Sequence, residues 1–196
     1  KGNICNELEA PKLKQNIMSS KSFGFMQTEL SEMEEAISSY CARAVEKMRG
    51  EKLLARKIHV FVKTNRHRID LLQYNESMDI KFIFPTDDLR LITKTATQCL
   101  KKIFKQGFFY KKAGVMLCDL IPNHITQFDL FNDVQDNQNL KAKMFMDVFD
   151  KINEKYGRNT ARLACEGFDK KWSMRSDMKS PAYTTRWEEL PNVIVR

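Results

Sequence analysis

The chain has 196 residues, of which 42% are hydrophobic and 30% are charged, and 33 Lys and Arg against 25 Asp and Glu leave a net charge of +8. This composition excludes disordered and fibrous proteins, and the length allows one domain, or one domain of about 120 residues with a smaller module. The positive charge attracts polyanions, so nucleic acid is the first candidate partner.

An anionic membrane surface is the alternative partner for a basic protein. It would favour a basic amphipathic helix with Trp and Phe on its apolar face, and no such helix stands out. No apolar run approaches the roughly 18 residues that cross a membrane, and the first residues form no hydrophobic signal core. We therefore expect a soluble, cytoplasmic protein with no membrane partner. The sequence begins at Lys1 without an initiator Met, and we expect it to be part of a longer protein.

The cysteines and histidines are scattered along the chain. The five cysteines contain no CxxC pair and the three histidines no HxH or HxxxH pair, so we expect reduced, buried thiols and no metal site. These residues are Cys5, Cys41, Cys99, Cys118, Cys165, His59, His67 and His124.

The first predicted element is a short strand over 17–23 that ends at Gly24. A helix should follow, because Ser31 and Glu34 fit a capping box and apolar residues recur at spacings of three and four until Gly50. The residues of this predicted stripe are Ile37, Cys41, Ala44, Val45 and Met48.

Two alternating runs, 58–64 and 80–84, predict a hairpin joined by a polar loop. Thr86 then fits the N-cap of a second helix, with a last strand over 109–121 in which Gly114 marks a bulge or a close backbone approach. The buried stripe of this helix is predicted as Leu89, Ile92, Ala96, Leu100 and Ile103.

The predicted order is β-α-β-β-α-β, in which a four-stranded sheet carries both helices on one face and leaves the other face open. The open face would display basic side chains, together with the loop that follows the second strand. These residues are Lys21, Lys63 and either Lys111 or Lys112, according to register, with Asn65, Arg66 and Arg68 from the loop.

The composition changes after residue 122. The stretch 132–139 is polar and turn-rich, which predicts a linker. Beyond it an apolar helical stripe ends at Gly157, and a short strand is expected around 162–165. The fold class is thus predicted as α+β, with a small α+β module after the first domain. The stripe residues are Met144, Phe145, Val148, Phe149, Ile152 and Tyr156.

Several stretches occur in an order seen in one family: 20–24, 36–44, 61–65, 85–88 and 110–117. Together they resemble the little-finger domain of Y-family translesion DNA polymerases. Trp172, Met174 and 180–187 resemble the small C-terminal domain found on the UmuC-like members of that family. Three residues depart from the family's usual pattern: Lys21 stands in place of Arg, Phe128 in place of Leu, and Ala182 in place of a basic residue.

The resemblance covers nearly the whole chain and implies a division into four parts. Residues 1–15 would be the end of a thumb domain, 16–122 the little-finger DNA-binding domain, 123–139 a linker, and 140–196 the UmuC-type C-terminal domain. The implied DNA-binding residues are Lys21, Ser22, Lys63, Asn65, Arg66, Arg68, Lys111 and Lys112.

Polymerases of this family insert nucleotides opposite damaged bases during the SOS response, and the resemblance implies UmuD′ and RecA as partners. Their chemistry needs carboxylates that bind two Mg²⁺ ions, and the motifs that supply them are absent from this sequence. The acidic pairs 34–35, 87–88 and 188–189 are interpreted as helix-start or surface charges. We therefore expect no catalytic residue, metal site or cofactor in this chain, although the parent enzyme would use Mg²⁺.

The linker contains a pentapeptide that resembles the motif by which bacterial polymerases bind the β sliding clamp. The Gln amide would hydrogen-bond at a pocket rim while Leu and Phe fill an apolar cleft. Packing of the apolar residues on the domain itself is the alternative. The residues are Gln127, Phe128, Asp129, Leu130 and Phe131.

Three further alternatives stay open. The aromatic residues after 140 form either a binding surface for UmuD′ or RecA, or the core of a small module. The chain could be a truncated regulator that competes for the clamp or for UmuD′. A basic RNA-binding domain of the same topology would need paired aromatic residues on its sheet, such as Phe61 with Phe82 or Phe84.

Overall fold

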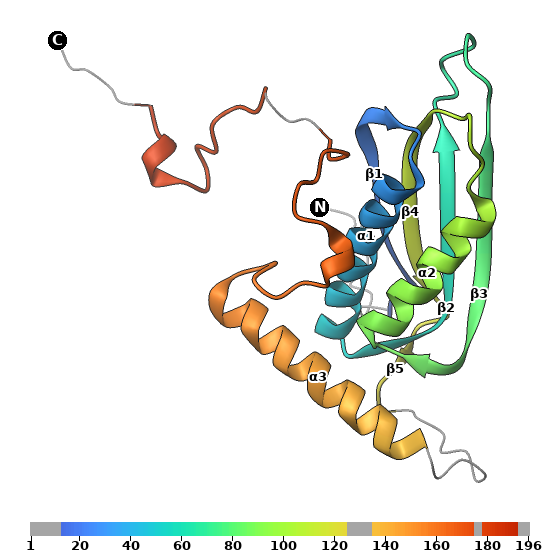
Figure 1. Cartoon of the computed structure of the whole chain (residues 1–196). Coiled ribbons are helices and arrows are strands. Elements are labelled where there is room, and N and C mark those ends of the chain that lie inside the picture. The colour runs from blue at the N-terminus through green and yellow to red at the C-terminus, as the bar shows by residue number, and fades with distance from the viewer. Residues whose placement is uncertain (1–12, 125–134, 175–177, 192–196) are drawn as a thin grey trace, which may run out of the picture.

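The computed structural model describes residues 13–124, 135–174 and 178–191 (Figure 1). Its first part consists of strands and two helices, and its second part consists of one long helix and short 3₁₀ turns. In chain order the elements are β1 (Asn16–Gln27), α1 (Leu30–Gly50), β2 (Leu53–Thr64), β3 (Asn75–Thr86), α2 (Leu89–Ile103), β4 (Tyr110–Cys118), β5 (Ile121–Pro122), α3 (Gln135–Tyr156), η1 (Ala164–Glu166) and η2 (Trp187–Glu189).

The sheet has the strand order β1-β4-β2-β3, and every neighbouring pair is antiparallel. Consequently β1 runs parallel to β2 with β4 between them, which is a split βαβ arrangement. Both α1 and α2 lie on one face of the sheet (Figure 1). The predicted βαββαβ order with one open sheet face is confirmed, and β5 adds a short pairing to the start of β2.

Alternation along the strands places one set of side chains against the helices. Ile58 lies directly opposite Leu117, and Val60 lies opposite Val115. All four side chains are fully buried, and they form one core with the inner faces of both helices. The apolar stripes predicted for α1 and α2 are buried in this core, which confirms them.

The predicted helix starts were wrong in detail. Helix α1 begins at Leu30 with Glu29 as N-cap and no side-chain cap, so Ser31 lies within the helix and forms no capping box. The N-cap of α2 lies two residues after the proposed cap, because Thr86 is still part of β3. Asp88 is the N-cap, and its carboxylate accepts a hydrogen bond from the Arg90 amide at 2.9 Å.

Helix α3 ends before Gly157, whose φ of 99° is left-handed. The apolar stripe predicted for this helix is largely solvent-facing: Met144, Val148 and Tyr156 are exposed, whereas Phe149 is partly buried against the core. Among residues 141–156 of α3, the fully buried side chain is that of Met146. The expected strand around 162–165 is a 3₁₀ turn, and residues 135–174 and 178–191 contain no strand.

The segment after α3 packs against α1 and the edge of the sheet. Trp172 is buried in the same core as the sheet residues, and its ring lies edge-on to Tyr40 with 5.6 Å between centroids. Its carbonyl accepts a hydrogen bond from the Gly24 amide of β1 at 3.2 Å. Glu166 is buried beside α1, and desolvation raises the pKa of its carboxyl group. The second part of the chain therefore completes the core of the first.

Gly114 in β4 marks the close approach that the sequence suggested. A Cβ at this position would lie 2.3 Å from the Cβ of Ser20 and 2.7 Å from the Phe61 ring. These two residues are its cross-strand neighbours in β1 and β2. The Phe61 ring occupies the space that a side chain at position 114 would need, so only glycine fits this register.

We predict that Gly114→Ala lowers the free energy of unfolding by about 2 kcal/mol, because the added methyl group overpacks the sheet. Gly50→Ala is the matched control. No atom lies within 4 Å of the Cβ position at the end of α1, so this change should be neutral or slightly stabilising. Urea unfolding of both variants measures the difference. Equal stability of the two variants would contradict the steric account.

Candidate nucleic-acid interface

The open face of the sheet is organised in rows that cross the four strands. Residues directly opposite one another on neighbouring strands share a face. Lys63 pairs with Lys112 on one side and with Asn75 on the other, and Lys112 pairs in turn with Ser22. We call these four residues the basic row. They come from all four long strands.

The two lysines of the basic row lie directly opposite each other. Like charges in this position destabilise a sheet. Among the described residues, no carboxylate forms an ion pair with either lysine. The repulsion between Lys63 and Lys112 is therefore not offset within the described chain, and an anion bound between them would relieve it.

A second set of basic side chains lies on the same face. Lys57 and Lys81 are cross-strand partners, and Lys57 shares its face with His59 and Lys63 by alternation. Asp79 lies 3.7 Å from the Lys57 ammonium and also contacts the His59 ring, so it offsets part of this charge. The candidate set from sequence left out Lys57 and Lys81. Lys57 lies two residues before His59 in β2, and Lys81 is its expected hairpin neighbour in β3. Alternation along the two strands could therefore have identified both lysines from the sequence.

Phe61 lies between these two sets of charges, on the open face. It is only 8% exposed because its ring covers Gly114, and the Lys63 ammonium lies 5.4 Å from its centroid. Phe82 lies two residues after Ile80 and points to the same face of the sheet. Both residues pack against the core under the helices. An exposed pair of Phe61 and Phe82, which a stacking platform for RNA bases needs, is not formed.

Two of the proposed DNA-binding lysines lie elsewhere. Lys21 pairs with Ala113, which belongs to the helix side of the sheet, so its placement on the open face was wrong. The Lys111 ammonium donates a hydrogen bond to the Phe23 carbonyl at 2.8 Å. Lys112, and not Lys111, is the residue of this pair that joins the basic row.

The loop after β2 carries the remaining candidates. The Asn65 side chain accepts a hydrogen bond from the His67 amide at 3.1 Å and shapes the first turn. Arg68 binds the Asp70 carboxylate through two hydrogen bonds of 2.8 and 2.6 Å, so its charge is already paired. Arg66 is exposed, and its guanidinium lies beside the His67 ring.

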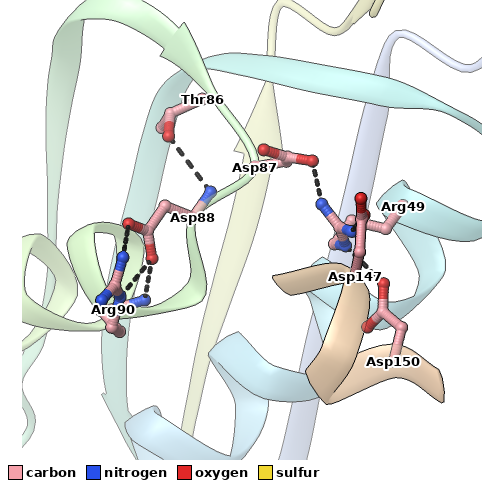
Figure 2. Close-up of polar contacts among 7 residues, drawn as sticks. All are labelled: Arg49, Thr86, Asp87, Asp88, Arg90, Asp147 and Asp150. Carbon is pink, nitrogen blue, oxygen red and sulfur yellow. Dashed lines mark hydrogen bonds and ion pairs between the residues drawn. The ribbon is translucent and has the colours of Figure 1, made fainter. Parts of the chain in front are cut away.

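A cluster around Arg49 holds α3 against the first part of the chain (Figure 2). The Arg49 guanidinium, whose side chain is 10% exposed, contacts Asp87 before α2 and both Asp147 and Asp150 of α3. Burial raises the pKa of the Asp87 carboxyl group, although its contact with Arg49 opposes that shift. One cation therefore joins three segments that are far apart in sequence.

In the orientation that Arg49 helps to hold, Phe145 and Val148 of α3 are exposed. Phe145, Val148, Phe149 and Ile152 line an apolar groove of about 470 Å³ together with the segment 160–163 and Phe168. The guanidinium of Arg90 lies over the Phe145 ring at 4.5 Å. A second cleft, of about 840 Å³, separates α1 from α3 and the segment that ends at Trp172.

The described part of the chain contains no group of three or more His, Cys, Asp or Glu residues that could hold a metal ion. Cys41, Cys99 and Cys118 are buried free thiols as expected, whereas Cys165 is exposed. No helix within the described ranges is long and apolar enough to span a membrane. The proposed clamp-binding pentapeptide, 127–131, lies outside the described residues.

Comparison with known proteins identifies two matching family models. One is described as the impB/mucB/samB family C-terminal domain and matches residues 14–130. The other is described as a domain of unknown function (DUF4113) and matches residues 143–193.

Curated relatives are similar over nearly the whole chain. Protein UmuC of Salmonella typhimurium is 42% identical over 195 residues, which are 98% of this chain and 46% of that protein. Protein MucB of Escherichia coli is 36% identical over 197 residues, which are 100% of this chain and 46% of that protein. The chain thus spans about half the length of the curated relatives it matches.

Similar solved structures include a DinB family error-prone DNA polymerase from Sulfolobus solfataricus. Its TM-score is 0.46 at 14% identity, over 55% of this chain and 30% of that chain. An insertion ternary complex of Dbh DNA polymerase has a TM-score of 0.44 at 14% identity, over 59% of this chain and 32% of that chain.

We predict that Arg49→Met loosens α3 from α1, because three carboxylates lose their common partner while the aliphatic stem is kept. The free energy of unfolding should fall by about 2 kcal/mol, and amide hydrogen exchange in α3 should accelerate. Arg43→Met is the control, because Arg43 is more exposed and, among the residues that the structure describes, forms an ion pair with Glu46 alone. Unchanged exchange in α3 of the Arg49 variant would refute this role.

Proposed function

Because the chain belongs to the impB/mucB/samB family, we propose that it is the DNA-binding and partner-recruiting part of an error-prone translesion DNA polymerase, a UmuC subunit of DNA polymerase V. The parent enzyme would act in SOS DNA repair and mutagenesis, in the bacterial cytoplasm and at the nucleoid when active. The chain would hold primer-template DNA while the remainder of the polymerase carries the catalytic carboxylates and Mg²⁺. In this proposal the chain itself performs no nucleotidyl transfer.

The basic row is the observation that carries the DNA-binding proposal. Lys63 and Lys112 lie opposite each other without a described carboxylate partner, and Ser22 adds a hydroxyl group on the same row. Ammonium and hydroxyl groups bind phosphate oxygens whatever the base sequence. Each phosphate that a lysine neutralises releases counterions, which favours binding at low salt. Binding without base contacts suits a protein that must accept damaged templates.

We predict that Lys63→Met/Lys112→Met weakens DNA binding and lowers its salt dependence. Losing two phosphate contacts should reduce the slope of the logarithm of the binding constant against the logarithm of salt concentration by about 2. Lys94→Met/Lys102→Met removes the same charge from exposed positions of α2, on the helix side of the sheet, and should change the slope little. Fluorescence anisotropy with duplex DNA at several salt concentrations measures both variants.

Two outcomes would count against this account. If both double variants weaken binding equally, net charge matters and the open face does not. If the unaltered chain binds DNA as tightly at high salt as at low salt, the contact is not electrostatic.

The linker pentapeptide is proposed to recruit the β sliding clamp. Leu130 and Phe131 would be the apolar anchors, with Gln127 at the pocket rim and Phe128 and Asp129 between them. The support is the sequence pattern between the last strand and α3.

We predict that Leu130→Ala/Phe131→Ala abolishes binding to the bacterial β clamp while the fold is kept, because both anchors are lost. Surface plasmon resonance on immobilised clamp measures the binding, and circular dichroism checks the fold. Asn132→Ala, one residue beyond the pentapeptide, is the control. Clamp binding that survives in the double variant would dispose of the pentapeptide as the recruiting motif.

The apolar groove of α3 is proposed as the contact for the UmuD′ dimer or for RecA. The support is that Phe145 and Val148 of this groove are exposed, while Phe149, Met146 and two aspartates of the same helix pack inward. Exposed apolar surface of this kind marks interaction sites in soluble proteins.

We predict that Phe145→Ser/Val148→Ser weakens binding of UmuD′, or of RecA, to the whole chain by tenfold or more, because about 1.4 kcal/mol of apolar burial corresponds to that factor. Lys143→Ser/Lys151→Ser changes two exposed residues of the same helix as a control. Isothermal titration calorimetry with each partner separates the two candidates. Unchanged affinity for both partners would exclude the groove as their contact.

A further inference from the structure

The loop of residues 65–74 projects beyond the sheet between β2 and β3 (Figure 1). It presents two large aliphatic side chains to solvent: Ile69 is 96% exposed and Leu72 is 73% exposed. Aliphatic side chains at the tip of a projecting loop add nothing to the core, so their exposure has to be explained by something outside the domain or by mere tolerance.

The backbone of this loop is held in place by its own side chains. The Gln73 amide group donates to the carbonyls of Asn65, Arg68 and Leu71 at 3.2, 2.8 and 3.0 Å. The Gln73 side-chain oxygen accepts a hydrogen bond from the Thr64 hydroxyl at 3.0 Å. The amides of Arg68 and Leu71 close two successive turns. Ile69 and Leu72 are therefore presented from an ordered scaffold, which lowers the entropy cost of using them in binding.

Two cationic side chains near this tip, Arg66 and Lys63, have no described carboxylate partner. Arg68 and Asp70 neutralise each other, which leaves Arg66 as the cation of the loop without an ion-pair partner among the described residues. Lys63, the last open-face residue before the loop, belongs to the basic row. A polyanion that lies across the basic row thus passes next to an apolar tip.

We propose that Ile69 and Leu72 form an apolar tip that contacts exposed base faces of unpaired or unstacked nucleotides, beside the phosphates bound by the basic row. This inference rests on the proposed DNA-binding function. An intact duplex hides its base faces by stacking and offers mainly charged backbone, against which aliphatic groups gain little. An unpaired base offers an apolar surface, and aliphatic side chains are used in this way where DNA is unstacked. The tip therefore favours DNA with an unpaired stretch over a continuous duplex.

The test compares two DNAs of equal length, one a continuous duplex and one with a short single-stranded gap. The variant is Ile69→Ser/Leu72→Ser. Its control is Leu13→Ser/Leu91→Ser, which replaces two exposed aliphatic residues outside the loop and outside the four long strands, with exposures of 67% and 45%. All four positions are exposed, so both variants should fold normally, and thermal unfolding verifies this.

The unaltered chain should prefer gapped DNA. The loop variant should lose roughly tenfold in affinity for gapped DNA and less than about twofold for duplex, with the same salt slope as the unaltered chain, because only apolar contacts are removed. The control variant should change neither affinity.

An equal loss on both DNAs, no loss on either, or the same loss in the control variant overturns the proposal. Lys63→Met/Lys112→Met, measured on the same two DNAs, tests the proposed function separately. That variant should weaken both DNAs with a reduced salt slope, so a failure of the basic row and a failure of the apolar tip give different results.

Discussion

The open face depends on one steric constraint, the absence of a side chain at position 114. The Phe61 ring covers Gly114 and touches the place where a Cβ would be, with Ser20 on the other side. In a β-sheet, a slip of one residue moves every side chain to the opposite face. The contact at Gly114 thus fixes the register of β4 between β1 and β2, and with it the alignment of Lys63 with Lys112.

A second constraint decides the role of the chain after β5. Arg49 binds two aspartates of α3, and Trp172 inserts its ring beside Tyr40 in the core of the first part. Met146 and Trp172 are buried with the sheet residues. The side of α3 that carries Asp147 and Asp150 is therefore held inward by charge, and Phe145 and Val148 stay exposed. The orientation of α3 that brings its aspartates to Arg49 is also the orientation that leaves Phe145 and Val148 exposed.

The two proposed DNA contacts rest on different physics, which makes them complementary. Lysine ammonium groups on a sheet recognise phosphates and respond to salt, but they do not distinguish paired from unpaired DNA. Aliphatic side chains do not respond to salt, but they gain only where base faces are exposed. A surface that combines Lys63 and Lys112 with Ile69 and Leu72 would hold any DNA and favour the place where stacking is interrupted.

A glycine inside a strand pattern indicated a bulge or a close approach at Gly114, and the structure decided between them. The sequence by itself determined the order of elements from β1 to β4 and the inner faces of α1 and α2. Hydrophobic periodicity reports these features because they depend on which residues avoid water. It also indicated that the side chains of Lys63 and His59 point to the same face of β2.

Only the tertiary structure decided the remaining features. Lys21 lies in a Ser-rich edge strand whose pattern does not reveal its face, so pairing with Ala113 was needed to place it. Thr86 and Asp88 can both cap the N-terminus of a helix. Because β3 extends as far as Thr86, Asp88 is the N-cap of α2. The stripe of α3 is apolar enough for a core, yet Arg49 attracts the opposite side. Such outcomes depend on long-range pairing and charge, which local periodicity does not contain.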